Sequence, residues 1–554
     1  MASFSLSASG LILSLLVLAG YWLYRAAIPT PIPGIPYVKR SATRPLGEFP
    51  DAVKYNAKTR ELTKFLADKC VELDSPVVQV FMRPFSRPAQ DILARRTREF
   101  DRSNIFGDMF VSTIPHSMTV HPTDEQWRDN RRLMADTMST PFLHNVVAPQ
   151  EHAVFTSLLA LWRTKSSLAW DHAFEVTSDI DEVLLDSIIS VAFGTSTGVT
   201  QAQQTLLAAL PQLAGLSTQS DDAAVFPTAP RPPTYEAITT LGASTEIGLK
   251  SPFGRYHHAF ALKYYPKLRK AMRVKEALIT ERLQMAWNKF NAPEASEDDF
   301  KSACDLIVAR EVALAKKQGR APQYNSPIVC DELYGFLQAG FDTTAGTVKW
   351  GVKFVTRHQD VQKKLRQSLH SAFGQASGLA RHLDAVLEEI LRLGLTAPAN
   401  IRVITQDVEV LGYRIPKDVD VLMPTSGPSM TAAPMHIEES KRSKSSQLLS
   451  AEERWTGNWD PSTLEEFEPE RWLRTNTHGD IDFDPRAGPM QTFGGGIRGC
   501  FGRKQAMLGL RTIFIMVIWS FELLPIPEEL DSWAAEDLLT HQPQTTYVRL
   551  RSVV

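Results

Sequence analysis

Residues 493–502 read Phe-Gly-Gly-Gly-Ile-Arg-Gly-Cys-Phe-Gly, near the end of a 554-residue chain. Glycine carries no side chain, so a backbone this rich in glycine can approach a flat cofactor closely. A helical stretch, Lys504–Trp519, follows, and the amides and dipole of a helix N-terminus favour a thiolate at Cys500. Arg498 is placed to neutralise a carboxylate of such a cofactor. The alternative is a glycine-rich turn that holds a free cysteine as a small buried residue.

Helical periodicity dominates the rest of the chain. Apolar residues recur at spacings of three and four, which favours amphipathic helices. The stretches with this spacing are 123–138, 172–194, 258–290, 325–358 and 378–393. We therefore expect a mainly α-helical fold.

Strand and loop signals are fewer. Alternation typical of a strand is short and local, as at Val408–Tyr413, where Gly412 favours a turn. Residues 216–235, with four prolines, and the polar residues 425–460 predict loops. The sheet component should therefore be small.

Composition excludes several classes of protein. The 60 basic and 62 acidic residues nearly cancel, which argues against nucleic acid as a partner. The four cysteines, Cys70, Cys304, Cys330 and Cys500, form no CxxC pair, so neither a disulfide scaffold nor a zinc site is indicated. We expect an enzyme of a reducing compartment with at most one special thiol.

The N-terminus has the features of a membrane anchor. Residues 2–24 carry no formal charge, and residues 11–18 are almost wholly aliphatic. About 20 apolar residues cross a bilayer, and aromatic residues such as Tyr21 and Trp22 mark its edge. Arg25 follows, which predicts that the bulk of the chain is cytosolic. A cleaved signal peptide is the alternative, although no basic residue precedes the apolar stretch.

The domain division follows from this segment. We expect a transmembrane anchor at residues 1–25 and a stiff connector at 26–40, where four prolines disfavour a helix. No linker or repeat divides the remainder, so residues 41–554 are expected to form one catalytic domain.

The segment 493–502 matches, at every fixed position, the haem-binding signature F-x-x-G-x-R-x-C-x-G of the cytochrome P450 superfamily. The resemblance implies the cytochrome P450 fold, preceded by one transmembrane helix, and haem b with the Cys500 thiolate as axial ligand. The anchor and the proline-rich connector resemble those of single-pass members in the endoplasmic reticulum membrane, whose catalytic domain is cytosolic.

Residues 339–344, Ala-Gly-Phe-Asp-Thr-Thr, lie inside the helical stretch 325–358 and match the distal-helix pattern A/G-G-x-D/E-T-T/S. Glycine and threonine are poor helix formers, and threonine hydroxyls can bond backbone carbonyls. By resemblance, Thr343 is the oxygen-activating hydroxyl, Asp342 the acid of the proton relay, and Gly340 lies beside the cofactor. A surface patch is the alternative.

An E-x-x-R pair provides a further test of the resemblance. Glu389 and Arg392 share a helix face, but such pairs are common on protein surfaces and weak as support. Arg471 lies in the segment Phe467–Trp472, which resembles the P-E-R-F/W element of the superfamily. By resemblance, Glu389, Arg392 and Arg471 form a buried triad whose role is structural.

A W-x-x-x-R element, Trp127 and Arg131, places both side chains on one helix face. By resemblance they hold a haem propionate from the side, and Arg402, after the E-x-x-R helix, joins Arg498 in neutralising the propionates. The cofactor-binding residues so implied are Cys500, Arg498, Phe493, Trp127, Arg131, Arg402 and Gly340.

The implied reaction inserts one oxygen atom from O2 into a lipophilic organic substrate, and the other atom leaves as water. Too few residues follow Cys500 to hold flavin domains, so a separate NADPH-cytochrome P450 reductase should supply the electrons, with cytochrome b5 as a second donor. Arg132, Arg503 and Lys504 are expected on the face that docks such an acidic partner. The alternative is that these are ordinary solvated side chains.

The substrate is restricted only in class. The site should be mostly apolar, with Phe336, Ala339, Gly340 and Thr396–Ala399 as lining residues. The segment 100–103, Phe-Asp-Arg-Ser, resembles filamentous-fungal members, which favours terpenoid, alkaloid or polyketide tailoring in secondary metabolism.

Three other functions remain as alternatives: a haem-thiolate isomerase or dehydratase without external electrons, a non-catalytic haem sensor, and a membrane-tethered interaction protein without cofactor. An intact Asp342 and Thr343 speak against the first two, because neither needs a proton relay. The third would need none of the ordered motifs.

Overall fold

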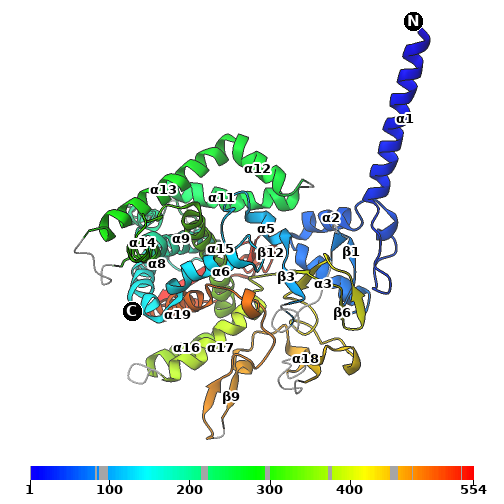
Figure 1. Ribbon diagram of the computed structural model, residues 1–554. Helices are drawn as coiled ribbons and strands as arrows, with labels where there is room; N and C mark the ends of the chain where they lie inside the picture. The colour runs from blue at the N-terminus through cyan, green and yellow to red at the C-terminus, as the bar shows by residue number, and fades with distance from the viewer. Residues whose placement is uncertain are drawn as a thin grey trace.

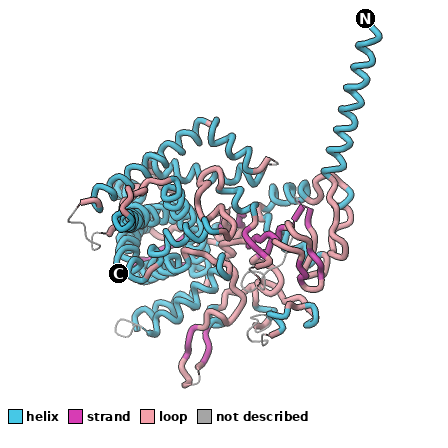
Figure 2. The backbone as a smooth tube through the Cα atoms, in the orientation of Figure 1, coloured by secondary structure: helices cyan, strands magenta, loops and turns pink. Residues whose placement is uncertain are grey.

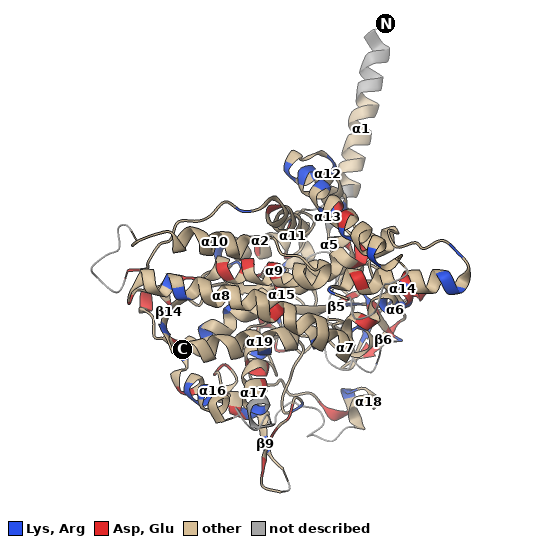
Figure 3. Cartoon of the chain, turned by 90° about the vertical axis from the view of Figure 1, so that its left-hand side faces the viewer, with Lys and Arg blue, Asp and Glu red and all other residues tan. Residues whose placement is uncertain are grey.

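The computed structural model describes residues 2–81, 84–85, 96, 98–213, 222–251, 253–292, 300–371, 377–448, 459–476, 478–537 and 539–553. A helical body carries most of the strands on one side, and the helix α1 (Ala2–Ala27) projects away from it (Figures 1 and 2). Basic and acidic positions are both scattered along the chain in Figure 3, in keeping with the net charge of −2.

Helices make up most of the body. They are α2 (Phe49–Thr59), α3 (Leu62–Glu72), α5 (Asn104–Phe110), α6 (Glu125–Met134), α7 (Thr140–Phe142), α8 (Ala148–Ala169), α9 (Thr177–Phe193), α10 (Val199–Ala208), α11 (Pro233–Lys250), α12 (Arg255–Tyr264), α13 (Pro266–Phe290), α14 (Ala303–Gln318), α15 (Pro327–Arg357), α16 (Gln359–Ser371), α17 (Ser377–Leu393), α18 (Lys444–Gln447) and α19 (Arg503–Ser520).

The strands are short. A five-stranded sheet has the order β1 (Val80–Phe81), β2 (Pro84–Phe85), β8 (Asp420–Pro424), β5 (Ala399–Ile404) and β3 (Phe100–Arg102). A three-stranded sheet has the order β11 (Phe521–Leu524), β14 (Tyr547–Ser552) and β4 (Phe174–Glu175). Three antiparallel pairs are β6 (Val408–Val410) with β7 (Tyr413–Ile415), β9 (Leu473–Thr475) with β10 (Ile481–Phe483), and β12 (Ala535–Asp537) with β13 (His541–Pro543). The mainly helical prediction is confirmed.

The helix predicted at 258–290 is two helices in the structure. The apolar periodicity at 258–290 is divided between α12 and α13, because the residue before Pro266 cannot easily be helical. Tyr265 is indeed extended, with φ −77° and ψ 122°.

A second difference lies at 172–194. Phe174 and Glu175 pair with Val548 and Tyr547 of β14, so α9 begins only at Thr177. A strand partner more than 370 residues away in sequence leaves no local signal.

The other periodic stretches match helices or a hairpin. The stretches 325–358, 378–393 and 504–519 correspond to α15, α17 and α19, and 123–138 to α6 with a following 3-10 turn. The alternation at 408–413 belongs to the β6–β7 pair, whose turn residues Leu411 and Gly412 have φ of 51° and 82°.

The two predicted loops fall partly outside the described residues, at 214–221 and 449–458. Residues 222–232 are irregular, and α11 begins at Pro233. The described part of 425–460 holds α18 and the 3-10 turn Glu439–Lys441.

Helix α15 runs through the middle of the hydrophobic core. One cluster of buried residues joins it to α8, α17, α19 and the C-terminal sheet, and another joins it to α9, α11, α13 and α14. Phe341, in the middle of α15, packs against both clusters. The distal-helix motif is therefore held rigidly between two parts of the core.

Helix α1 exposes apolar side chains. Leu11, Leu16 and Trp22 are 65–69% exposed. Within the ranges that the structure describes, no helix combines the length and the apolar character needed to cross a bilayer.

Candidate active site

A cavity of about 730 Å³ lies between α15 and the loop 493–502, and its other walls include α5, α6, β5, the start of α19 and the β12–β13 hairpin. Its lining is mostly apolar, which suits a lipophilic ligand. Phe336, Ala339, Gly340 and Thr396–Ala399, the lining residues predicted from the sequence, all belong to it.

The loop before α19 is closed on itself. The backbone amide of Cys500 donates to the carbonyl oxygen of Phe493 over 2.8 Å. Gly494 and Gly496 both have a φ of 63°, a backbone conformation that favours glycine. Asn400 of β5 donates to the carbonyl of Gln491 over 3.2 Å and so ties the loop to the sheet. The loop thereby holds Cys500 at one wall of the cavity.

Cys500 has an exposed side chain, and because it lines the cavity, that is the space its exposed surface meets. Burial in the protein raises the pKa of its thiol, while the backbone amides of Gly502 and Arg503 and the guanidinium of Arg131 lower it by less. The amides expected at a helix N-terminus are therefore present, yet desolvation outweighs them. A metal ion bonded to the sulfur would reverse this balance, because a coordinating thiol is deprotonated.

The opposite wall is the middle of α15. Thr343 lines the cavity, and its hydroxyl donates to the carbonyl of Ala339 over 2.7 Å. Such a bond is the competition for backbone carbonyls expected of threonine in a helix. Gly340 also lines the cavity, and a Cβ at this position would lie 2.6 Å from Cδ1 of Ile188 in α9. A larger residue here would require the end of the Ile188 side chain to move.

Asp342 is half-buried and is not among the cavity-lining residues. The hydroxyl of Thr540 donates to its Oδ2 and the amide of Gln542 donates to its Oδ1, each over 2.8 Å. Both donors come from the β12–β13 hairpin, and neither was singled out from the sequence, because no motif marks them.

Basic side chains gather at one edge of the cavity. Arg131 and Arg498 lie over the ring of Trp127, with their guanidinium carbons 5.4 and 4.6 Å from its centroid. Arg498 also donates to the carbonyl of His121 over 3.1 Å. Trp127, Arg131 and Arg498 line the cavity, so the structure brings these three predicted residues together.

Arg402 of β5 is buried and lies opposite Arg102 of β3 in the sheet register. Arg102 lines the cavity, whereas Arg402 does not. Sequence reasoning missed Arg102: the segment 100–103 carried only a family likeness, although an arginine flanked by Asp101 and Ser103 was the available signal.

This edge carries excess positive charge. Desolvation lowers the pKa of Arg402 and of Arg498 to about 10, and Asp101 opposes the shift in both. Desolvation and the neighbouring Arg498 and Arg402 lower the pKa of Arg102 as well, and Asp101 again opposes the shift. Since guanidinium groups stay protonated in proteins, the nearby carboxylates only partly balance these desolvated cations.

Two buried donors at this edge, Nε of Arg102 and Nη1 of Arg498, have no hydrogen-bond partner. Buried donors are almost always paired, so an anionic group fits here. Haem carries two carboxylates on one edge of a flat apolar ring. The arginine edge, the apolar cavity and the single thiol at its wall are together what that cofactor requires.

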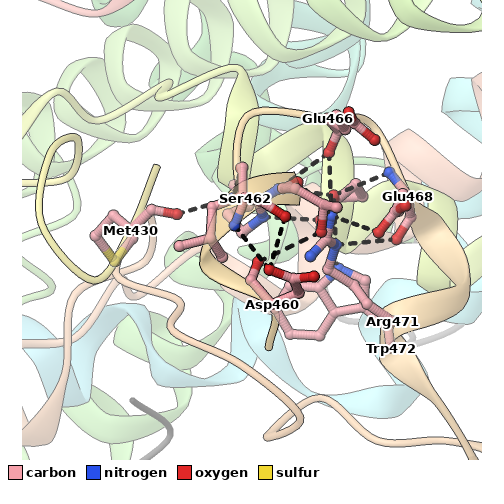
Figure 4. A network of polar contacts seen from close by, with 11 residues as sticks. Met430, Asp460, Ser462, Glu466, Glu468, Arg471 and Trp472 are labelled. Carbon is pink, nitrogen blue, oxygen red and sulfur yellow. Dashed lines mark hydrogen bonds and ion pairs between the residues drawn. The ribbon is translucent and has the colours of Figure 1, made fainter. Parts of the chain in front are cut away.

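A second set of charges, on α17 and the segment 469–472, is closed to solvent. Glu389 and Arg392 are fully buried, and Arg392 donates to both carboxylate oxygens of Glu389 over 2.8 and 2.7 Å. Arg471 approaches Glu389 to 3.0 Å, and Nε1 of Trp472 donates to it over 2.8 Å. Figure 4 shows this network with Arg471, Trp472 and the carbonyl of Met430. The structure thus brings the three predicted triad residues together.

The remaining donors of this set are also used. Arg392 donates to the carbonyls of Met430 and Leu464 over 2.8 and 2.7 Å, and Arg471 to that of Thr463 over 2.8 Å. The network therefore joins α17 to two distant stretches of the chain, at residues 430 and 463–472.

Comparisons with known proteins agree with this geometry. The family model described as Cytochrome P450 matches residues 89–430 and 462–548. The chain is 36% identical to cytochrome P450 monooxygenase GME11363 of Pestalotiopsis microspora, over 99% of each chain. It is 32% identical to cytochrome P450 monooxygenase TRI13 of Fusarium sporotrichioides, over 98% of each. Identity to cytochrome P450 monooxygenase xilC of Penicillium crustosum is 30%, over 96% of this chain and 94% of that one.

Matches of this extent cover the thiol loop, the distal helix and the arginine edge alike. The chain therefore belongs to the cytochrome P450 family and is a haem-thiolate monooxygenase.

Proposed function

We propose that Cys500 is the thiolate ligand of the haem and that Arg102, Arg131, Arg402 and Arg498 hold its propionates. When bound, the haem supplies the activation of O2 with two electrons from a redox partner. The supporting observation is the pairing of one thiol at the cavity wall with unpartnered guanidinium donors at its edge.

The first test is the carbon-monoxide difference spectrum of the reduced protein. Cys500→Ser should abolish the red-shifted Soret band that thiolate ligation produces. Cys330→Ser is the matched control, because Cys330 does not line the cavity, and it should leave the band in place. A parental band in Cys500→Ser would remove Cys500 as the ligand.

Thr343 and Asp342 are the proposed residues of oxygen activation. Thr343 presents its oxygen at the cavity, while its proton is bound to the Ala339 carbonyl, so it can accept a hydrogen bond there. Asp342 is the proposed proton source. Thr343→Ala should divert electrons from product into peroxide and water. Product formed at the parental rate without any reductant would instead favour the isomerase alternative.

The substrate is proposed to be a lipophilic organic molecule, and the reaction a hydroxylation, epoxidation or multi-step oxidation. Support comes from the apolar lining and from similarity to fungal monooxygenases, which favours tailoring of terpenoid, alkaloid or polyketide skeletons. A panel of such compounds, screened for a shift of the resting haem to high spin, would test the class. Shifts produced only by charged, hydrophilic compounds would contradict it.

Membrane association is proposed for residues 1–25, with a connector at 26–40 and the catalytic domain at 41–554 on the cytosolic side of the endoplasmic reticulum. The exposed apolar side chains of α1 support it. Exposed aromatic residues at α12 add a second apolar surface: Phe253, Tyr256, Phe260, Tyr264 and Tyr265. Deletion of residues 1–27 should move much of the protein into the soluble fraction while haem binding persists. Processing and secretion of the full chain would contradict the anchor.

The electron donor is proposed to be NADPH-cytochrome P450 reductase, with cytochrome b5 as a second partner. Arg132, Arg503 and Lys504 are exposed around α6 and the start of α19, on the cysteine side of the cavity. Complementary charge chiefly speeds association. Lys504→Glu should therefore slow reduction by the reductase, most at low salt, without changing the rate with dithionite. Equal reduction rates by the reductase would contradict this docking face.

A further inference from the structure

The β12–β13 hairpin packs directly on the distal helix. The ring nitrogen of Trp350 in α15 donates to the carbonyl of His541 over 3.2 Å. Gly346 faces Gln542, whose Cγ would lie 3.2 Å from a Cβ at that glycine. The hairpin therefore approaches α15 closely, one turn beyond Asp342, and its side chains can reach that carboxylate.

Thr540 stands between Asp342 and the cavity. Its hydroxyl donates to Oδ2 of Asp342 over 2.8 Å and accepts from Nε2 of Gln542 over 2.7 Å. Thr540 lines the cavity, whereas Asp342 does not. A hydroxyl has one proton and two lone pairs, so it can pass a proton from one neighbour to another.

Gln542 serves a different purpose. Its Nε2 donates to Oδ1 of Asp342 and its Oε1 accepts from Nζ of Lys349, each over 2.8 Å. Lys349 in turn forms an ion pair of 2.6 Å with Asp181 of α9. An amide gives up its proton far less readily than a hydroxyl, so Gln542 can orient Asp342 and Lys349 but is unsuited to conducting protons between them.

The hydroxyl of Thr343, by contrast, is committed to a helix carbonyl. The hydroxyl of Thr540, unlike that of Thr343, is already bonded to the carboxylate of Asp342.

We infer that Thr540 carries protons from Asp342 into the cavity, and that Gln542 is the positioning residue that holds the two together. The inference rests on the proposed role of Asp342 as proton source. Protonated Asp342 donates from Oδ2 to the hydroxyl oxygen of Thr540, which releases its own proton to an acceptor in the cavity. Asp342 is left as the carboxylate that the Thr540 and Gln542 donors stabilise, and it regains a proton from water on the side away from the cavity.

The first measurement follows the Asp342 carboxyl itself. In the holoenzyme, its infrared bands are identified by their loss in Asp342→Asn. Thr540→Val removes a donor to the carboxylate, so these bands should shift in frequency. Thr540→Ser keeps the hydroxyl and should leave them at the parental frequencies. Parental frequencies in Thr540→Val would show that the hydrogen bond to Asp342 is absent.

The second measurement is the share of electrons that reach product, in H2O and in D2O. In Thr540→Val, most electrons should go to peroxide and water instead of product, and the solvent isotope effect should be larger than in the parent. Thr540→Ser should restore both values. Thr546→Val is the matched control, because it removes a buried hydroxyl without a partner from the same C-terminal segment. If Thr540→Val loses haem, Thr540→Ala gives the same contrast.

Two outcomes test the role of Thr540 and the role of Asp342 separately. Poor coupling in Asp342→Asn with parental coupling in Thr540→Val would overturn the role of Thr540 and leave that of Asp342. Parental coupling in Asp342→Asn would overturn the proposed role of Asp342 itself.

Discussion

The arginines around Glu389 and those at the cavity edge differ in how their charge is balanced. Around Glu389, two guanidinium groups share its buried carboxylate, one of them also pairs with Glu468 over 2.8 Å, and their other donors reach backbone carbonyls. At the cavity edge, Asp101 opposes the lowering of the pKa by desolvation at Arg102, Arg402 and Arg498, and Asp124 does so as well at Arg498. Two donors of this group have no partner.

The difference distinguishes a structural cluster from a binding site. A buried ion cluster stabilises a fold only if its hydrogen bonds are satisfied within the protein, as they are around Glu389. A cluster with excess charge and free donors destabilises the fold until a ligand supplies the missing charge. Arginines occur in both groups, so their hydrogen-bond and charge partners reveal their different roles.

The largest effect is expected at the balanced cluster. Glu389→Gln would leave Arg392 buried without a counter-charge and Arg471 with only the partly exposed Glu468, which should cost about 3–5 kcal/mol of unfolding free energy. The thermal unfolding midpoint and the yield of haem-loaded protein should both fall. A midpoint equal to that of the parent would mean that the cluster is not structural.

Glu151 extends the comparison to a buried carboxyl group that burial keeps protonated. Burial raises its pKa from 4.5 to about 8, and its Oε2 accepts no hydrogen bond. Between these pH values the folded protein holds a proton that the unfolded chain has released, so stability falls as pH rises from about 4.5 to 8.

Glu151→Gln should therefore be the more stable form at pH 8, by about 2–4 kcal/mol, and should differ little from the parent near pH 4.5. Thermal unfolding at both pH values measures this difference. An equal pH dependence in parent and variant would show that Glu151 does not titrate in this range.

At the cavity edge, a substitution should weaken haem binding rather than the stability of the fold. Arg498→Leu removes one proposed propionate partner, which at about 1.5–3 kcal/mol predicts haem loss roughly ten- to a hundredfold faster. Transfer of haem to an excess of apomyoglobin gives the rate. Arg128→Leu, an exposed change on α6, is the control and should lose haem at the parental rate. A parental rate in Arg498→Leu would contradict its role at the propionates.

The smallest effect is expected for an ion pair that is exposed to solvent. Lys364 and Glu470 form an ion pair of 2.6 Å with both side chains about half exposed. Glu470→Gln should change the unfolding free energy by less than about 1 kcal/mol, because solvent screens the pair. If Glu470→Gln lowered the unfolding free energy as much as Glu389→Gln, burial would not explain the difference between the two ion pairs.

Much of the site could be predicted because its residues lie in short motifs. The loop at 493–502 and the residues at 339–344 carry their spacing locally, and α15, α17 and α19 begin and end close to where periodicity indicates. The error at 258–290 had a visible cause in Pro266, since a proline forbids one of the helical bonds. The strand at Phe174 had none, because its partner is at the other end of the chain.

The motifs specify which side chains occur but not what they contact. Asp342 is identifiable from residues 339–344, yet its partners Thr540 and Gln542 lie some 200 positions away in a segment without a signature. No sequence motif marks Arg102 either, and it lines the cavity because β3 pairs with β5. Local spacing determined the helices, and the resemblance of the short motifs to those of the cytochrome P450 superfamily implied the cofactor. The charge balance of each arginine group and the route from Asp342 to the cavity were decided by tertiary packing, because hydrogen bonding and desolvation depend on neighbours in space.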